Sequence, residues 1–127
     1  MPAPKVTQLK LKQKSRLLVI AFADNTAGEL SCEFLRVHSP SAEVQGHGTP
    51  ILVTNKKQVN ISNIEPVGHY GVKLVFDDGH DTGIYSWEVL HHLVSHHQSL
   101  WQSYLERLTN EKGSREAIIP MVVKYRP

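Results

Sequence analysis

Hydrophobic and polar positions alternate most clearly in residues 72–76, where Val72, Leu74 and Phe76 are separated by single residues. A period of two predicts a strand with one buried face. The Asp-Asp-Gly-His run at 77–80 then predicts a hairpin turn, because Gly79 readily adopts the positive φ that such turns need. A short second strand is expected over residues 81–85.

A helix is predicted to follow this hairpin. Ser86 can cap its first turn, where Glu88 suits the helix dipole. Apolar side chains then recur every three or four residues, at Trp87, Leu90, Val94, His97, Trp101, Leu105 and Leu108. This stripe predicts one long amphipathic helix that runs to about residue 109, with a break near Ser95 left open. We expect Trp87 and Trp101 to pack on the sheet.

The first half of the chain also favours strands. Residues 1–8 are expected to be a loose arm, 9–12 and 16–23 to be strands, 24–28 a turn and 29–31 a returning strand. Ser31 is placed to cap a short helix up to residue 37, with Phe34 and Leu35 toward the core. Residues 38–50 are rich in Ser, Gly and Pro and predict a long loop. Residues 51–54 fit a strand or a helical turn, and 59–64 a strand closed by Pro66.

These elements predict an α+β fold, in which strands outnumber helices and short links favour antiparallel pairing. We expect a two-layer sandwich, a mainly antiparallel sheet covered by one long C-terminal amphipathic helix. The whole chain, 1–127, is interpreted as one domain with a core at about 9–109. Residues 110–127 form a tail whose apolar part is expected to dock in an extended conformation.

Composition narrows the class of protein. The 127 residues are 40% hydrophobic, enough for a core, and the net charge of +2 is too small to indicate nucleic-acid or anionic-membrane binding. No apolar run resembles a signal peptide or approaches membrane-spanning length. The single cysteine, Cys32, excludes an intrachain disulfide and suits a reducing compartment. We therefore expect a cytoplasmic protein that binds neither nucleic acid nor membrane.

The densest polar cluster is Asp77, Asp78, His80 and Asp81, within one turn. Carboxylate and imidazole groups at this spacing are compatible with metal binding or acid–base chemistry. The same residues are compatible with hairpin formation alone, and the pattern favours that second interpretation.

Three further residues could carry chemistry. His92 and His96 lie four apart, so on a helix they would share a face and could chelate a metal. Cys32 would lie near the start of the short helix, where a thiolate can be stabilised, although a buried thiol fits equally well. No phosphate-binding Gly-rich loop and no Gly-x-Ser-x-Gly motif occurs in the sequence.

Three stretches together carry a resemblance to a known family. They are Glu-Phe-Leu-Arg at 33–36, Pro-Val-Gly-His-Tyr-Gly at 66–71, and Phe-Asp-Asp-Gly-His-Asp-Thr-Gly-Ile-Tyr-Ser-Trp at 76–87, followed by Leu90. In these segments the chain resembles the gamma-butyrobetaine hydroxylase-like N-terminal domain family, over about residues 9–93. The chain looks like a stand-alone small bacterial member.

The resemblance implies a zinc site that this sequence does not preserve. The family's hydroxylases carry zinc on a Cys-rich segment after the Leu-Arg pair and on the histidine of the Asp-Gly-His turn. His80 matches that histidine, but Ser39, Ser41 and Val44 stand where the cysteines would be. Hydroxyls are poor zinc ligands beside thiolates, and an alkyl side chain cannot bind zinc. His38 or His47 could rebuild a weaker site with His80.

The resemblance also implies a role without catalysis. In the family this domain precedes the jelly roll of 2-oxoglutarate, iron(II)-dependent carnitine-biosynthesis hydroxylases, or accompanies P-loop iron–sulfur carrier ATPases. The jelly roll and its iron-binding triad are absent here, so no catalytic residues and no cofactor are expected.

Two functions lead in this reading, ahead of a third, an independent enzyme. The first is a non-catalytic accessory domain for a protein partner, such as an oxygenase or an iron–sulfur carrier, with an interaction loop that includes Ser39, Ser41 and His47. The alternative is a small zinc- or iron-binding protein that uses His80 with His38 or His47. Either the loop at 39–50 is mobile, or hydrogen bonds and packing replace the metal near His80. We expect mobility in the free protein and ordering when a partner binds.

Overall fold

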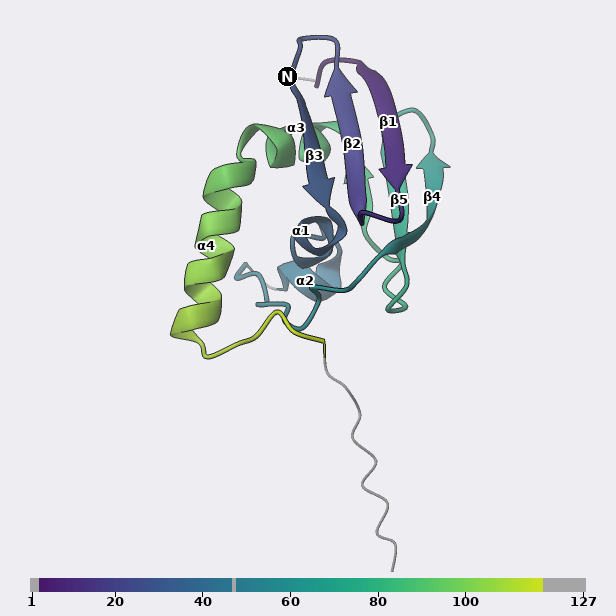
Figure 1. Ribbon diagram of the computed structural model, residues 1–127. Helices are drawn as coiled ribbons and strands as arrows, with labels where there is room; N and C mark the ends of the chain where they lie inside the picture. The colour runs from purple at the N-terminus through teal and green to yellow at the C-terminus, as the bar shows by residue number, and fades with distance from the viewer. Residues whose placement is uncertain (1–2, 47, 118–127) are drawn as a thin grey trace, which may run out of the picture.

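Two small antiparallel sheets form the framework of the protein in a computed structural model, which describes residues 3–46 and 48–117 (Figure 1). The first sheet has the order β1-β2-β3 and consists of β1 (Val6–Lys12), β2 (Leu17–Phe22) and β3 (Ala27–Ser31). The second has the order β4-β5-β6 and consists of β4 (Ile61–Val67), β5 (Gly71–Phe76) and β6 (Ile84–Ser86). The predicted α+β class is confirmed.

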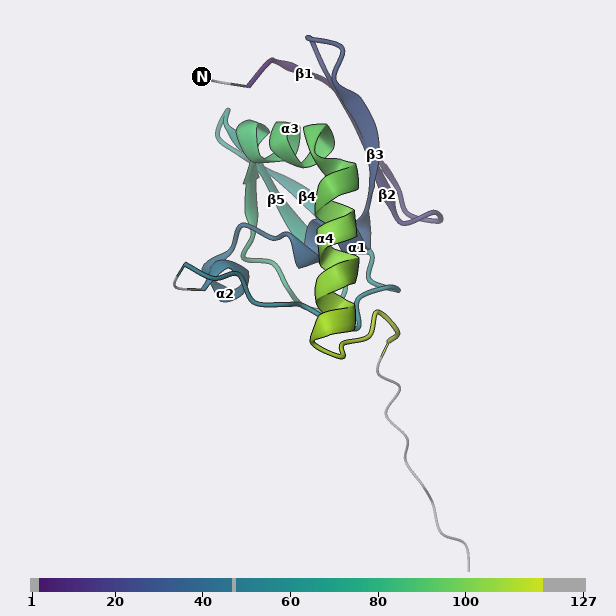
Figure 2. The same cartoon turned by 90° about the vertical axis from the view of Figure 1, so that its left-hand side faces the viewer.

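The main hydrophobic core lies between the two sheets, which face each other in Figure 2. Alternate residues of β2 and β5 are buried, as the period of two requires. The fully buried side chains include Leu18, Ile20, Phe34, Leu35, Ile61, Leu74, Tyr85 and Leu90. They come from both sheets and two helices, so the core forms only when segments distant in sequence meet.

Four helices complete the fold of the described residues. They are α1 (Cys32–Val37), α2 (Ala42–Gln45), α3 (Trp87–Ser95) and α4 (His97–Asn110). Both predicted caps are present: Ser31 Oγ accepts a hydrogen bond from Phe34 N at 3.0 Å, and Ser86 Oγ accepts one from Val89 N at 3.1 Å. Among the described residues, no helix has both the length and the apolar composition that spanning a membrane requires.

The single long helix of the prediction is two helices, α3 and α4. The break is at His96, whose backbone (φ −114°, ψ 19°) closes α3 and opens α4. The two helices serve different clusters, since α3 buries Leu90 and Leu93 in the main core whereas α4 buries Tyr104 and Leu108 in a second one with Val37. A continuous helix would carry a single straight apolar stripe, so the bend lets one run of sequence cover both clusters.

The predicted sheet and strands differ from the structure in five places. One continuous sheet was expected, but two separate sheets form. Residues 6–8 belong to β1, Pro66 lies within β4, and residues 51–54 form neither a strand nor a helix. The strand expected at 81–85 begins only at Ile84. Gly83 instead passes so close to residue 39 that a Cβ there would lie 2.4 Å from Ser39 Oγ.

Both tryptophans contact the main core, as expected, but neither is fully buried. Trp87 Nε1 donates a hydrogen bond to the carbonyl oxygen of His69 at 2.9 Å. Trp101 lies on α4 beside Phe34, with 6.4 Å between the ring centroids. Each ring is therefore only partly buried.

The segment after α4 returns to the body of the molecule. Asn55 N donates to the carbonyl oxygen of Ser114 at 2.7 Å, and Lys57 N donates to that of Arg115 at 2.9 Å. These bonds lay residues 114–116 alongside 55–57. The apolar part of the predicted tail, residues 118–127, lies outside the described residues.

Gly79 provides a first test of the fold. Its φ is +90°, as the hairpin prediction requires, and no heavy atom would come within 4 Å of an added Cβ. Gly79→Val should therefore act through backbone strain and reduce the free energy of unfolding by roughly 1–3 kcal/mol. Gly79→Asn is the matched control and should cost less, because asparagine tolerates positive φ better than a β-branched residue. Equal urea midpoints for wild type and the valine variant would contradict the assignment.

Candidate functional site

The acidic residues of the 77–80 turn build the turn itself. Asp78 Oδ1 accepts a hydrogen bond from His80 N at 3.1 Å, and Asp77 Oδ1 accepts one from Asn60 N at 3.0 Å. Phe76 N donates to the carbonyl oxygen of His80 at 2.9 Å. This arrangement supports the hairpin interpretation of the polar cluster and leaves His80 as the side chain that points into the protein.

His80 is the centre of a polar cluster that contains the buried Ser39 and Ser41 and the exposed Glu43. Its Nε2 lies 2.8 Å from Ser39 Oγ and 3.4 Å from Ser41 Oγ, while its Nδ1 lies 3.3 Å from Glu43 Oε2. Ser39 is fully buried, and His80 is only 7% exposed. Both ring nitrogens thus have partners from the segment that follows α1. We call these four residues the His80 cluster.

The His80 cluster anchors the segment that was expected to be a loop. Ser41 and Val44 are buried, and Gln45 Nε2 donates to the carbonyl oxygen of Ser39 at 2.8 Å. Residues 42–45 form the short helix α2. For residues 39–46, hydrogen bonds and packing hold the segment against the turn, as the alternative to a mobile loop predicted, whereas mobility in the free protein stays a prediction. From the sequence, Val44 was considered only as a residue that cannot bind zinc, and its buried side chain was not predicted to hold the segment.

A guanidinium group borders the same cluster. Arg36 Nε donates to Asp78 Oδ2 at 2.9 Å, and Lys56 Nζ lies 2.7 Å from the same oxygen. Among the described residues, Arg36 Nη1 is a buried side-chain nitrogen without a hydrogen-bond partner. Burial and the Arg36 charge together lower the pKa of His80, against the opposing charges of Glu43 and Asp78. The electrostatics beside His80 therefore disfavour an added positive charge.

The other predicted ligands lie in different surroundings. His38 Nδ1 is 2.9 Å from the carbonyl oxygen of Phe34, and its ring packs against Phe34 and Tyr104. His47 lies outside the described residues. The rings of His92, in the last turn of α3, and His96, at the break after it, lie 4.4 Å apart, so the predicted proximity is present. Cys32 is a buried free thiol, and burial raises its pKa to about 11, which opposes thiolate chemistry.

Residues 9–91 match the family described as gamma-butyrobetaine hydroxylase-like, N-terminal. The chain belongs to this family. The matched unit is the N-terminal part of hydroxylase-like proteins and not their catalytic domain. It includes α1, the His80 cluster and the first residues of α3, so the features described above are those that the family match spans.

Solved structures of similar proteins extend over nearly the whole chain. Two proteins with NMR solution structures are 62% and 40% identical, cover 98% of this chain and 95% and 98% of their own, and each has a TM-score of 0.79. A crystal structure of a protein of unknown function from Acidithiobacillus ferrooxidans, of the DUF971 family, is 37% identical with a TM-score of 0.61. The match covers 71% of this chain and 92% of the chain in the crystal structure. Among curated proteins, no significant match is found.

The side chains present do not fit the zinc site that family resemblance implied. The positions expected for thiolates hold two hydroxyls and a buried alkyl group, and Arg36 adds a positive charge beside His80. Over residues 3–46 and 48–117, no three His, Cys, Asp or Glu side chains are grouped to hold a metal ion. The geometry nevertheless brings Ser39 and Ser41 to His80, as the family pattern predicts for the residues at those positions.

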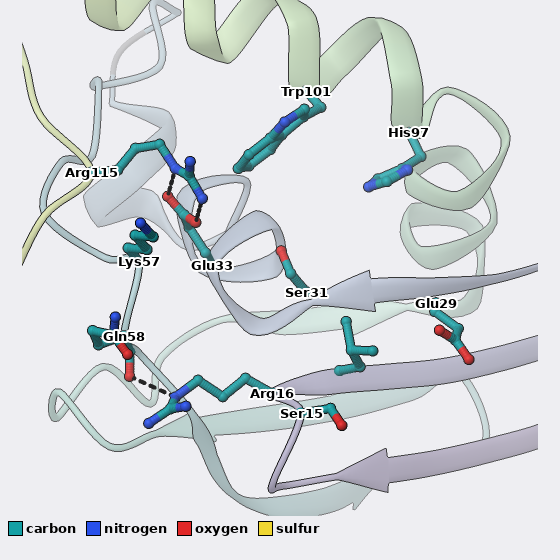
Figure 3. A pocket seen from close by; sticks show the side chains of 11 residues that line it. Ser15, Arg16, Glu29, Ser31, Glu33, Lys57, Gln58, His97, Trp101 and Arg115 are labelled. Atoms are coloured by element: carbon teal, nitrogen blue, oxygen red, sulfur yellow. Dashed lines mark hydrogen bonds and ion pairs between the residues drawn. The ribbon is translucent and has the colours of Figure 1, made fainter.

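Sequence reasoning missed a pocket beside the first turn of α1 that has charged side chains in its walls (Figure 3). Its volume is about 490 Å³, and it lies between the β1–β2 turn, α1, α4 and the segment after α4. Glu33 and Arg115 form an ion pair within it, and Trp101 lies beside them. The two charged residues are 82 positions apart, so no local pattern could have paired them. Glu33 lies in the Glu-Phe-Leu-Arg stretch that carries the family resemblance, but nothing in that stretch predicts an ion-pair partner for its carboxylate.

An apolar groove runs beside the anchored segment and was also missed. Two adjoining cavities of about 430 and 200 Å³ share Val37, His38, Pro50 and Leu100 in their walls. Ile51, at one edge, is 54% exposed. The groove joins residues from α1, the segment before β4, α3 and α4, so its walls are assembled by tertiary packing.

The buried His80 and the partly buried His38 predict a loss of stability in acid. The pKa values of His80 and His38 are both lowered, chiefly by burial. The unfolded chain therefore binds these protons more readily than the native protein once the pH falls below the ordinary histidine pKa of about 6.5. Their stabilising contribution is present above that pH and is lost as the pH falls toward the lower native pKa values.

We expect the free energy of unfolding, measured with urea, to decrease between about pH 7 and pH 5. A double variant, His38→Asn with His80→Asn, should show a shallower pH dependence, whatever its stability at neutral pH. A stability that rises toward the acidic end would contradict the assignment.

Proposed function

We propose that this chain is a non-catalytic accessory domain that binds a protein partner. The observation that carries the proposal is the His80 cluster. A catalytic histidine must reach a reactant, but His80 is 7% exposed and both of its ring nitrogens contact side chains of the 39–43 segment. The most characteristic turn of the family is thus used here to hold a surface segment in place.

The surface held by this cluster is the proposed binding face. Val37, Pro40 and Pro50 line the apolar groove on one side, and Leu93 and Leu100 line it on the other. Ser39 and Ser41 are buried, so they would support this face from beneath and not contact the partner directly. An apolar side chain of a partner protein is the chemistry that suits such a groove. The partner's identity is proposed only as a class, an oxygenase or an iron–sulfur carrier.

A cytoplasmic site of action belongs to the same proposal. It is supported by Cys32, which is a free buried thiol and suits a reducing compartment.

Capture from a native lysate, with two matched variants, tests the binding face. Ile51 and Tyr70 are both 54% exposed, but only Ile51 lies in the groove wall, whereas Tyr70 lies in the turn between β4 and β5. A specific partner should be retained by wild type and by Tyr70→Asp, and should be lost by Ile51→Asp. A partner that is lost equally with both variants, or with neither, would count against this face.

The metal content of the tag-free protein distinguishes the accessory domain from the alternative, a small metal-binding protein. A binding module without a metal should contain substoichiometric zinc and iron. One equivalent of either metal, lost in His80→Ala, would instead favour the alternative in which His80 acts as a ligand with His38 or His47.

A further inference from the structure

The pocket in Figure 3 contains a buried carboxylate with a specific partner. Glu33 lies in the first turn of α1 and is 4% exposed. Arg115 Nε donates to Glu33 Oε2 at 2.8 Å, and Arg115 Nη2 donates to Oε1 at 2.8 Å. Both carboxylate oxygens are therefore engaged by the planar fork of one guanidinium group, the geometry for which arginine is better suited than lysine.

An aromatic ring contributes the next contact. The Arg115 guanidinium carbon lies 5.0 Å from the centroid of the Trp101 ring, within the range of a cation–π interaction. Tyr104 also borders the carboxylate: burial, followed by the charge of Glu33, raises the pKa of its hydroxyl to about 12. The Arg115 guanidinium thus contacts the Glu33 carboxylate on α1 and the Trp101 ring on α4.

The guanidinium comes from a segment that lies outside the sheets and helices. Residues 114–116 are bound through their carbonyl oxygens to Asn55 and Lys57, and Lys57 Nζ forms an exposed ion pair with Glu116. Glu33 and Trp101 belong to helices that pack on the core. Glu33 and Trp101 thus belong to the packed helices, whereas Arg115 belongs to an edge segment that is held by hydrogen bonds to residues 55–57.

The pocket also continues beyond the ion pair. Ser15, Arg16 and Leu17 from the β1–β2 hairpin, with Gln58, extend its walls away from Arg115. Its volume of about 490 Å³ leaves space for a peptide beside the guanidinium position.

We propose that Glu33 and Trp101 form a receptor site for an arginine side chain, which this protein fills with its own Arg115. An arginine of a basic peptide from another protein can occupy the site when residues 114–116 are displaced. The pocket shares no lining residue with the His80 cluster or the apolar groove, so the proposal stands independently of the function proposed above.

Chemical rescue tests the receptor. Arg115→Ala leaves the Glu33 carboxylate without its partner and should lower the melting temperature. Ethylguanidinium at millimolar concentration should raise the melting temperature of Arg115→Ala, whereas ethylammonium, which has the same charge without the fork, should raise it less. Neither compound should stabilise the wild type or the double variant Glu33→Gln with Arg115→Ala.

Equal effects of ethylguanidinium on all three proteins, or no effect on Arg115→Ala, would overturn the proposal and leave Glu33–Arg115 as a structural ion pair. If Arg115→Ala does not fold, Arg115→Gln is used in the same comparison.

Peptide titration distinguishes the two sources of the guanidinium. A short arginine-containing peptide is added to each full-length protein while NMR follows the indole N–H of Trp101. Occupation by Arg115 reduces the fraction of wild type that can bind, so the apparent affinity should be about tenfold or more higher for Arg115→Ala than for wild type. The lysine version of the peptide should bind more weakly. Equal affinity for both proteins, or no shift of the Trp101 signal in Arg115→Ala, would overturn the proposal.

Discussion

Replacing Ser39, Ser41 and Val44 with cysteine is expected to convert the His80 cluster into a tetrahedral zinc site. Ser39 Oγ and Ser41 Oγ lie 2.8 and 3.4 Å from His80 Nε2 in the native protein, so two introduced sulfur atoms would start close to the imidazole. Zinc needs contacts of about 2.3 Å to sulfur and about 2.0 Å to nitrogen, which requires only a small expansion of the cluster. Glu43, at Nδ1, would orient the ring from the other side.

The expected effect is large, because a structural zinc site of this composition contributes about 10 kcal/mol or more of binding free energy in zinc-finger peptides. Zinc should bind the triple variant at one equivalent and raise its melting temperature, and it should do neither in wild type. His80→Ala in the triple variant is the matched control and should weaken binding strongly. Failure of the triple variant to bind zinc would mean that Val44 does not occupy the position of a third ligand.

Removal of the Phe34 side chain is expected to produce the second large effect. Phe34 is fully buried, and its ring contacts those of His38, His97 and Trp101, with centroids 4.5, 4.6 and 6.4 Å away. Phe34→Ala should reduce the free energy of unfolding by about 3–5 kcal/mol, through lost burial and the cavity that remains. Urea unfolding, followed by the fluorescence of Trp87 and Trp101 together, measures the stability.

Tyr70→Ala is the control, because its side chain is 54% exposed and its loss should change the stability by no more than about 0.5 kcal/mol. Similar losses for the two variants would contradict the packing described for α1.

Local chemistry was sufficient to predict several elements of this protein. Gly79 has the positive φ expected of its turn, and Ser31 and Ser86 cap the helices that follow them. These predictions succeed because a turn or a cap depends on a few adjacent residues and their backbone dihedrals. The family resemblance also located His80 correctly in the hairpin turn.

The tertiary structure decided how these elements combine. The stripe from Trp87 to Leu108 is continuous in sequence, yet α3 and α4 pack against different clusters and bend at His96. Likewise, residues 39–45 contain Ser and Pro and predict an irregular loop, but His80, about 40 positions away, supplies the hydrogen-bond partner that anchors them.

The two proposed binding surfaces also depend on residues that are distant in sequence. Glu33 and Arg115 are separated by 82 positions, and the walls of the apolar groove come from helices and segments that adjoin only in the folded chain. The sequence by itself determined most of the strands, the two serine caps, the Asp-Gly turn and the family. Only the tertiary structure decided the two-sheet arrangement, the bend at His96, the His80 cluster and the Glu33–Arg115 pair. The physical reason is that periodicity and capping are properties of neighbouring residues, whereas burial and ion pairing depend on which distant segments the whole core brings together.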